Sequence, residues 1–538
     1  MSIAIFIPAI KKNVAFADDL VKKLDGVTLI QRAINKAKGI KLCQKIYVIT
    51  DSEEICLISK RNNVHHYYKK DIKLSKAPIM EDLSCILSEF TDQYTEMVLL
   101  SPYAPMLREK DILGAVNEFR SNKNYQLLIT VKKEISRVFK ENRRGVREVP
   151  IGHHEQDFLI ESQALNILSS SSVKKRIDLK KMTPIVYELD QDLLEIKSYQ
   201  DWWVCEKLLR RKRVVFRIIG DEKVGMGHIY RALALAHEIT DHEVYFVCEA
   251  KSHKAMARLA DNNYWLGVYK ASEIENRIID LKPDLVINDM LNTKRSYILK
   301  LRKKGIRVIN FEDLGAGASY ANLTINELYE KSIVSGNNIL YGQKYFFLRE
   351  EFNNAIPRRF KKKVDTLLVT FGASDPSDFT RKSFRNILNY CKAMKIKIFL
   401  VTGEGYPHIK KLQKEIKGLP ESQVQYVHTT GIMSHIMEQS QIAIAANGRT
   451  AYELGHMNIP SIILSHHTRE TKHSFATRER GFIPIGLYKG AKTDKKILKS
   501  LKKLVENHSF RKNCFEQIKP FRFQKNKNRV LRLIFELL

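Results

Sequence analysis

The residues best suited to chemistry lie in the stretch VGMGHIYRALALAHEI, at positions 224–239. An apolar run, VVFRIIG, precedes it and a helical pattern follows, so it predicts a strand, a glycine-containing turn and a helix. Gly225 and Gly227 would let a ligand approach the backbone closely. His228 falls at the helix start as a candidate general base, and Arg231, on the same helix face, could hold an anion. Taken alone, the pattern more often marks a structural histidine at a helix start.

Two later turns have the same strand-to-helix form and suit a nucleotide. They are TFGASDPSDFT (370–380), which is rich in hydroxyls and carboxylates, and AIAANGRTAYELG (443–455), where a new helix presents free N–H groups to a phosphate. Five of their residues are candidate nucleotide contacts: Gly372, Ser374, Asn447, Gly448 and Thr450. Glu453, one turn into that helix, could accept hydrogen bonds from the two ribose hydroxyls. The alternative is an acid that the helix dipole stabilises near the N-terminus.

Regular alternation of strands and helices must position these turns. In the first third, SIAIFIP, KIYVITD and EMVLLSP are each followed by a helical pattern, which is typical of a mainly parallel sheet with crossover helices. The pattern restarts at VVFRIIG and again after the linker-like EFNNAIPRRFKKKVD. We therefore predict an α/β protein of three units: 1–210, 213–360 and 363–538. Ligands of such sheets gather at the carboxyl ends of strands, and the cleft between the last two units is the expected substrate site.

Composition limits the classes of partner. The 538 residues have a formal net charge of +31, which suits nucleotide phosphates, nucleic acid or, as a peripheral partner, an anionic membrane face. Because the basic residues are spread along the chain without a nucleic-acid-binding motif, nucleic acid is the least favoured of these. Seven cysteines without a CxxC pair, and no apolar run of bilayer-spanning length, predict a cytoplasmic protein. No sequence feature specifies an oligomeric state.

Six segments in order add a family resemblance. GMGHIYRALALA, DLVINDM, VINFEDLGAGASYANLTIN, LYGQKYFFLREEF, TFGASDPSDFT and NGRTAYELG resemble the UDP-sugar hydrolase of the pseudaminic-acid pathway and the related spore-coat polysaccharide proteins. The resemblance covers about residues 213–490. It implies a GT-B-like pair of Rossmann domains, with UDP on the C-terminal half and the sugar between the halves. It also implies that UDP is removed from a diacetamido-trideoxy sugar without a metal or other cofactor, with His228 as the base.

The same resemblance suggests sugar-binding residues and contains one departure. Four polar residues at strand ends are expected to face the cleft: Asp289, Asn310, Asp313 and Asn326. Where the hydrolases usually carry an Asn-Gln pair after the last strand of the nucleotide half, this chain has HHTRETKHSFATRERGF (466–482). The departure leaves a transferase open, in which a sugar or lipid-linked hydroxyl replaces water.

The first third resembles a second family, the acylneuraminate (CMP-nonulosonate) cytidylyltransferases. IFIPA, GVTLIQRAINKA, KIYVITDSEEI, VLLSPYAPMLREKDILGAVNEF and EIKSYQDWWVCEKLL follow that family's order and spacing over about residues 1–210. The resemblance implies a Rossmann-like, GT-A-like nucleotidyltransferase domain. Its substrates would be CTP and a nonulosonic acid, with CMP in the product and Mg²⁺ as the cofactor if the domain is active.

Two departures predict that this CTP site is degenerate. The family places Arg-Gly-Gly-Ser-Lys after Pro-Ala, whereas this chain has IKKNV; Lys11 and Lys12 keep positive charge but cannot restore the close approach that glycine permits. The family's Asp-Ile-Asp metal pair is matched by Glu195 and Lys197, and a lysine there opposes a divalent cation. Asp51 is then expected to be structural rather than a metal ligand.

Three hypotheses for function follow. The first is an enzyme that cleaves UDP from a UDP-linked amino sugar in nonulosonic-acid or surface-polysaccharide synthesis, by hydrolysis or glycosyl transfer. The second is a bifunctional protein whose first third also makes CMP-nonulosonate from CTP, and the altered IKKNV loop speaks against it. The third is a non-catalytic nucleotide-sugar-binding scaffold, which is opposed by the joint presence of His228, Glu453 and both glycine turns.

Overall fold

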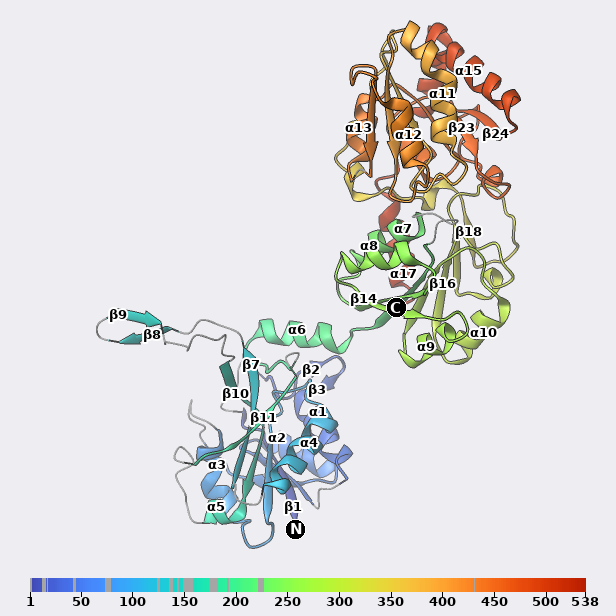
Figure 1. Ribbon diagram of the computed structural model, residues 1–538. Helices are drawn as coiled ribbons and strands as arrows, with labels where there is room; N and C mark the ends of the chain where they lie inside the picture. Colours follow the sequence, from blue (N-terminus) through green and yellow to red (C-terminus); the bar gives the residue numbers. More distant parts are fainter. Residues whose placement is uncertain are drawn as a thin grey trace. The chain divides into compact units, whose positions relative to one another are not determined.

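The computed structural model divides the chain into two compact units, Met1–Arg211 and Lys212–Leu538 (Figure 1). It describes residues 2–11, 16, 18–41, 45–72, 79–122, 126–134, 139–142, 145–148, 158–174, 182–190, 193–220, 227–429 and 431–538. Two residues singled out in the sequence, Lys12 and Gly225, lie outside the described residues. None of the described helices combines the length and apolarity needed to cross a bilayer.

The first unit is built on one seven-stranded sheet of order β11-β7-β10-β6-β1-β4-β5. Its strands are β1 (Ile3–Pro8), β4 (Lys45–Thr50), β5 (His65–Tyr68), β6 (Glu96–Leu100), β7 (Leu127–Glu134), β10 (Phe158–Ser169) and β11 (Ile185–Glu188). Only β10 runs antiparallel to its neighbours, β6 and β7. The helices of this unit are α1 (Leu29–Gly39), α2 (Glu53–Arg61), α3 (Ile79–Ser88), α4 (Glu109–Ser121), α5 (Ser170–Lys174) and α6 (Tyr199–Leu209). Two hairpins lie outside the sheet: β2 (Lys23–Leu24) pairs with β3 (Val27–Thr28), and β8 (Phe139–Asn142) pairs with β9 (Gly145–Glu148).

The second unit begins with an all-parallel sheet of order β14-β13-β12-β15-β16-β17-β18, the first half of the unit. Its strands are β12 (Arg213–Ile218), β13 (Glu243–Glu249), β14 (Trp265–Tyr269), β15 (Leu285–Asp289), β16 (Arg307–Phe311), β17 (Leu323–Asn326) and β18 (Ile339–Tyr341). The helices between them are α7 (Gly227–Ala236), α8 (His253–Ala260), α9 (Ile274–Asp280) and α10 (Arg295–Lys303). The central strands are apolar and buried along almost their whole length, as a parallel sheet covered on both faces requires.

A second parallel sheet, of order β21-β20-β19-β22-β23-β24, forms the other half. Its strands are β19 (Thr366–Thr370), β20 (Lys397–Thr402), β21 (Val424–His428), β22 (Ile442–Ala446), β23 (Ser461–Ser465) and β24 (Ile483–Leu487). The helices of this half are α11 (Phe379–Ala393), α12 (Ile409–Ile416), α13 (Met433–Gln439), α14 (Arg449–His456), α15 (Ala491–Glu506) and α16 (His508–Ile518). Short 3₁₀ turns occur at Ala318–Tyr320, Gln343–Tyr345, Glu350–Phe352 and Glu470–Lys472.

The last helix, α17 (Asn526–Phe535), falls within the predicted third unit, 363–538, but its buried face packs in the first half. Its buried residues Val530, Leu531 and Ile534 join the core of the first half, beside Val214 and Phe216 of β12. Figure 1 shows α17 and the chain's C-terminus among the elements of that half. Three apolar residues at helical spacing indicate only that the helix has a buried face, and not which core receives it.

The predicted fold class is confirmed by these sheet orders. One mixed α/β sheet forms a Rossmann-like, GT-A-like unit, and two parallel α/β halves form a GT-B-like pair. In the pair, each half presents the carboxyl ends of its strands, where the topology of parallel sheets places ligands.

Candidate active site

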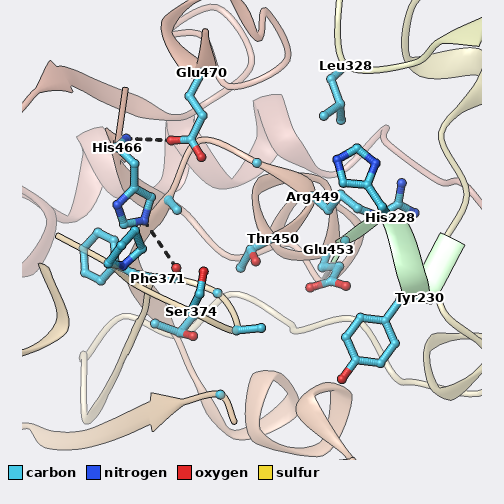
Figure 2. Close-up of a pocket in the computed structure, with 18 of the residues that line it drawn as sticks. His228, Tyr230, Leu328, Phe371, Ser374, Arg449, Thr450, Glu453, His466 and Glu470 are labelled. Carbon is cyan, nitrogen blue, oxygen red and sulfur yellow. Dashed lines mark hydrogen bonds between the residues drawn. The ribbon is translucent and has the colours of Figure 1, made fainter. Parts of the chain in front are cut away.

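A cavity of about 300 Å³ lies between the two halves of the second unit. The first half contributes the start of α7, with Gly227, His228 and Tyr230. The second half contributes the loop after β19 and the start of α14, with Ser374 and Thr450 among the lining residues. Figure 2 shows these side chains on facing walls of the cavity. The cavity therefore joins the three glycine-containing turns that the sequence singled out.

His228 is held from behind by Asp289, the last residue of β15. Its Nδ1 lies 2.5 Å from Asp289 Oδ1. Burial would raise the pKa of Asp289, but Arg231, followed by His228, outweighs burial and lowers it to about 2. An ionised carboxylate can only accept, so Nδ1 carries the proton and Nε2 keeps its lone pair for chemistry. The arrangement fixes the tautomer that a general base on the cavity wall needs.

Arg231 lines the cavity, and its guanidinium is held by two carboxylates. Its Nε and Nη2 donate to Asp289 at 2.7 and 2.5 Å, and its Nη1 donates to Glu327 at 2.8 Å. Only 2% of the residue is exposed. Glu312 lies 4.0 Å from the same Nη1. Burial raises the pKa of Glu312 to about 7, against the opposing effect of Arg231, and Glu327 adds to the rise.

The four candidate sugar-binding residues lie behind the cavity wall rather than on it. Asp289 supports His228. Asp313 accepts from the backbone N–H groups of Thr293 and Gly315 at 3.0 and 2.8 Å, which fixes the loop after β16. Asn310 donates to Asp313 Oδ2 at 2.7 Å, and Asn326 donates to the Asp313 carbonyl at 3.0 Å. All four are almost completely buried, and their position at strand ends serves the fold of these loops.

In the second half, Gly372 and Ser374 form the cavity wall after β19. Gly372 has a φ of +82°, a conformation that glycine adopts without strain. The loop then leads into α11, where Asp375 accepts from the N–H groups of Phe379 and Thr380 at 2.9 and 2.7 Å. A carboxylate at this position satisfies free N–H groups of the helix start, so this helix terminus is already capped.

The start of α14 is arranged differently, because no side chain in the described part of the chain caps it. Gly448 is the N-cap, and it lines the cavity together with Thr450 and Glu453. Glu453 is buried, and its Oε1 accepts from Arg349 Nε at 3.0 Å. Asn447 does not line the cavity; its amide donates to the Glu470 carbonyl at 2.7 Å and holds the loop that follows β23. The uncapped N–H groups of α14 form the phosphate-type cradle of this half.

The loop after β23 was the departure from the family pattern, and it supplies lining residues that the sequence interpretation did not assign. These are His466, His467, Arg469, Glu470 and His473. His466 stacks on Phe379, and its Nε2 lies 3.4 Å from the Phe371 carbonyl. Figure 2 marks the contact between His466 and Phe371 with a dashed line. With Nε2 donating there, Nδ1 of His466 is left without a hydrogen-bond partner among the described residues. The HHTRE sequence itself, two histidines after a buried strand, was the available signal.

In the first unit, the residues of the expected CTP site pair with one another. Lys11 donates its ammonium to Glu54 at 2.8 Å, and its backbone N–H to Asp51 at 2.7 Å. Lys197 Nζ lies 3.9 Å from Glu195 Oε2. Because that ammonium supplies the positive charge beside Glu195, these residues do not fit a divalent cation. Among the described residues, no group of three or more His, Cys, Asp and Glu is arranged to hold a metal.

Taken together, the second unit is a two-half α/β protein with a tautomer-fixed histidine facing an uncapped helix start. No protein-family model matches the chain. Among named proteins, it is similar to the spore coat polysaccharide biosynthesis protein SpsG of Bacillus subtilis, at 25% identity over 49% of this chain and 80% of the relative. It is also similar to the UDP-2,4-diacetamido-2,4,6-trideoxy-beta-L-altropyranose hydrolase of Campylobacter jejuni, at 25% identity over 44% of this chain and 85% of the relative.

A protein of Methanocaldococcus jannaschii, MJ1062, is 27% identical over 46% of this chain, and the chain spans about half of that relative's length, 54%. Among solved structures, MurG of Acinetobacter baumannii covers 60% of this chain at 13% identity, with 99% of its own length matched and a TM-score of 0.45. A CMP:2-keto-3-deoxy-manno-octonic acid synthetase covers 39% of this chain at 12% identity, with 98% of its own length matched and a TM-score of 0.32.

Proposed function

We propose that the second unit cleaves the bond between UDP and an amino sugar, with His228 as the general base. The observation that carries the proposal is His228 on one cavity wall, with Asp289 behind it, facing the uncapped start of α14 on the other wall. A base and an anion cradle on facing walls suit a substrate with a reactive sugar carbon at one end and a diphosphate at the other. The similarity to the Campylobacter jejuni hydrolase supports UDP and a diacetamido-trideoxy sugar as the two parts.

The proposed reaction uses groups of this chain alone. His228 Nε2 takes a proton from water while the water oxygen attacks the anomeric carbon of the sugar. The bond from that carbon to the β-phosphate oxygen breaks, and UDP leaves with its electron pair. Nδ1 meanwhile donates to ionised Asp289, which stabilises the imidazolium as it forms. The free N–H groups of α14 and the loop of Gly372 and Ser374 would stabilise the charge that develops on the leaving diphosphate.

Two residues are proposed to select the nucleotide. Glu453 lines the cavity one turn into α14, and it can accept from the ribose hydroxyls while Arg349 holds its Oε1. His466 also lines the cavity, and its imidazole, stacked on Phe379, can contact the nucleotide. Both are fixed by neighbouring groups, Glu453 by Arg349 and His466 by stacking on Phe379, so little side-chain freedom is lost on binding.

We further propose that the first unit does not transfer nucleotidyl groups. The Lys11 ammonium, which the sequence offers for a triphosphate, is 2.8 Å from Glu54 and 3.1 Å from Asp18. Lys197 beside Glu195 opposes Mg²⁺. The unit would then bind a sugar acid or partner, or stabilise the second unit, and a bifunctional enzyme is the less favoured alternative.

The experiment that tests the main proposal is turnover of the UDP-linked diacetamido-trideoxy sugar in the presence of EDTA. UDP release and free sugar are followed by chromatography and mass spectrometry, with and without sugar acceptors. The proposal expects UDP release that EDTA does not abolish. Free sugar as the product indicates hydrolysis, and a new glycoside indicates transfer to an acceptor. Absence of UDP release under all these conditions would contradict the proposal.

A further inference from the structure

Arg449 is an unusual residue to find at the first position of the uncapped helix α14. A cation there would ordinarily be expected to face an incoming phosphate. Arg449 does line the cavity, but its Nη1 donates to Glu327 Oε1 and its Nη2 donates to the Phe347 carbonyl at 2.7 Å. The guanidinium also lies over the ring of Phe346, 4.5 Å from its centroid. Arg449 therefore extends from the second half to Glu327, which follows β17, and to Phe346 and Phe347, which follow β18.

The acceptor of Arg449 belongs to a buried chain of alternating charges that ends at His228. Glu327 Oε1 accepts from Arg449 and, at 2.8 Å, from Arg231. Arg231 in turn donates to Asp289, and Asp289 accepts from His228 Nδ1. Glu327, Asp289 and Arg231 are each at most 2% exposed. Charge-assisted hydrogen bonds between such buried groups are strong and require a defined geometry. A change at Arg449 therefore alters the hydrogen bonds of the other charged groups in this series.

Among the described residues, Arg231 is the only other cation paired with Glu327. Its Oε2 is buried and without a hydrogen-bond partner among the described residues, so both of its strong contacts fall on Oε1. Removing Arg449 leaves a buried carboxylate that must be neutralised by Arg231 alone. Arg231 would then move away from Asp289 towards Glu327, and Asp289, which holds the imidazole of His228, would shift.

The two helix starts also approach each other at this point. A Cβ at Gly227, the first residue of α7, would lie 3.4 Å from Arg449 Cδ. The aliphatic part of the Arg449 side chain thus packs beside Gly227, the residue that precedes His228, while its guanidinium donates to Glu327. Both contacts tie the nucleotide half to the element that carries the base.

We propose that Arg449 is a positioning residue that couples the nucleotide half to the His228 base through Glu327, Arg231 and Asp289. The inference rests on the proposed function, because it assigns a part in that reaction. Arg449 does not act on the substrate; it holds the halves in the one arrangement in which the imidazole is aimed at the sugar. A displacement of about 1 Å in a reacting group lowers rates by about 100-fold.

The test is Arg449→Met, which keeps the apolar stem and removes the guanidinium. We expect kcat for UDP release to fall about 100-fold, with the Kd for UDP alone, measured by calorimetry, within about threefold of wild type. Arg449→Lys, which can reach one acceptor, should recover part of the kcat. If Arg449 instead contacts the diphosphate, the Kd for UDP in Arg449→Met rises tenfold or more, and the inference is overturned.

The matched control is Arg480→Met. Arg480 also joins the two halves, since its Nη1 donates to Glu330 at 3.1 Å. Glu330 makes its other described side-chain contact with the Gln343 N–H, and not with the charge chain. A general loosening of the halves would lower kcat in both variants. The inference expects wild-type kcat in Arg480→Met, and equal losses in the two variants would overturn it.

A second readout does not depend on turnover. The imidazole Nδ1–H of His228, 2.5 Å from Asp289, should give a downfield proton resonance that is assigned by its loss in His228→Gln. We expect it in wild type and in Arg480→Met, and shifted upfield or lost by exchange in Arg449→Met. An unchanged resonance in Arg449→Met would overturn the inference. Absence of UDP release by wild type would refute the proposed function while this measurement still decides the role of Arg449.

Discussion

Asp289→Asn changes one charge behind the imidazole while keeping the shape of the side chain. In the structure the carboxylate accepts from His228 Nδ1 at 2.5 Å and from Arg231 Nε and Nη2 at 2.7 and 2.5 Å. An asparagine has a single acceptor oxygen and an NH₂ that can only donate. Arg231 offers only donors, whereas the imidazole can move its proton, so we expect the amide oxygen at the Oδ2 position, where it accepts from Arg231 Nε. The NH₂ then takes the Oδ1 position, where it faces Nδ1 and also Arg231 Nη2. The imidazole must then carry its proton on Nε2, which is the wrong tautomer for a base facing the cavity.

The size of the effect follows from this tautomer. General-base catalysis contributes about 10²–10⁴-fold, and loss of the tautomer-fixing carboxylate in a Ser-His-Asp triad lowers kcat about 10⁴-fold. We therefore expect kcat for UDP release to fall by about 10²–10⁴, or about 3–5 kcal/mol of transition-state stabilisation. The Kd for UDP should stay near wild type, because Asp289 is 1% exposed behind the wall.

Stability changes less than activity in the same variant. The pKa of Asp289, about 2 when folded against an ordinary 3.8, corresponds to about 2 kcal/mol of stability, which the carboxylate supplies above pH 3.8 and loses as the pH falls through 2. The free energy of unfolding of small domains is about 5–15 kcal/mol, so Asp289→Asn should remain folded with a lower melting temperature. The assay is steady-state UDP release beside calorimetric melting at pH 7.5. A folded variant with kcat within threefold of wild type would refute the role given to the His228–Asp289 pair.

Three further predictions concern Glu312, Glu453 and the first unit. Because burial raises the pKa of Glu312 to about 7, folding favours its protonated form, and stability is lost as the pH rises from 4.5 through 7. Glu312→Gln should therefore raise the free energy of unfolding at pH 8 by up to about 3 kcal/mol, and the melting temperature with it, but not at pH 4.5. An equal shift of the melting temperature at both pH values would contradict this. Glu453→Ala should raise the Kd for UDP about tenfold or more by calorimetry, as hydrogen bonds to a charged group contribute about 1.5–3 kcal/mol, and an unaltered Kd would exclude the ribose contact. The full chain with CTP, Mg²⁺ and a nonulosonic acid should release no pyrophosphate, whereas steady release would establish a bifunctional enzyme.

Local patterns were sufficient for those parts of the site that depend on backbone. A strand, a small residue and a helix start are readable from a dozen residues, so the turns at Gly227, Gly372 and Gly448 were predicted and the structure brings all three to one cavity. The same holds for the sheets, whose buried apolar strands need no partner information to be recognised.

Contacts between side chains far apart in the sequence could not be predicted from such local patterns. The strand-end rule placed Asp289, Asn310, Asp313 and Asn326 at the correct edge of the sheet, but it does not say which side chains reach a ligand and which fix the loops. Arg231 was expected to hold an anion because it shares a helix face with His228. Its two carboxylate partners lie 58 and 96 residues away in the sequence, so this local pattern could not indicate them. Only the folded chain shows that its charge is already matched.

The helix α17 and the loop after β23 were missed for the same reason. Three apolar residues on α17 predict a buried face, and only the tertiary structure shows that this face belongs to the first half. The HHTRE segment departs from the family pattern, so no role could be transferred to it. Its stacking on Phe379 and its contact with the Phe371 carbonyl appear only when β19 and β23 stand in one sheet.

The central claim is that His228 is the base that cleaves a UDP–sugar bond, and His228→Ala tests it most directly. UDP release is measured with the UDP-linked diacetamido-trideoxy sugar, and the affinity for UDP alone is measured on the same preparation. The account predicts that UDP release falls below detection while the Kd for UDP stays near wild type, because the cradle of α14 lies on the opposite wall. Turnover that persists near the wild-type rate, or loss of UDP binding together with turnover, would contradict it.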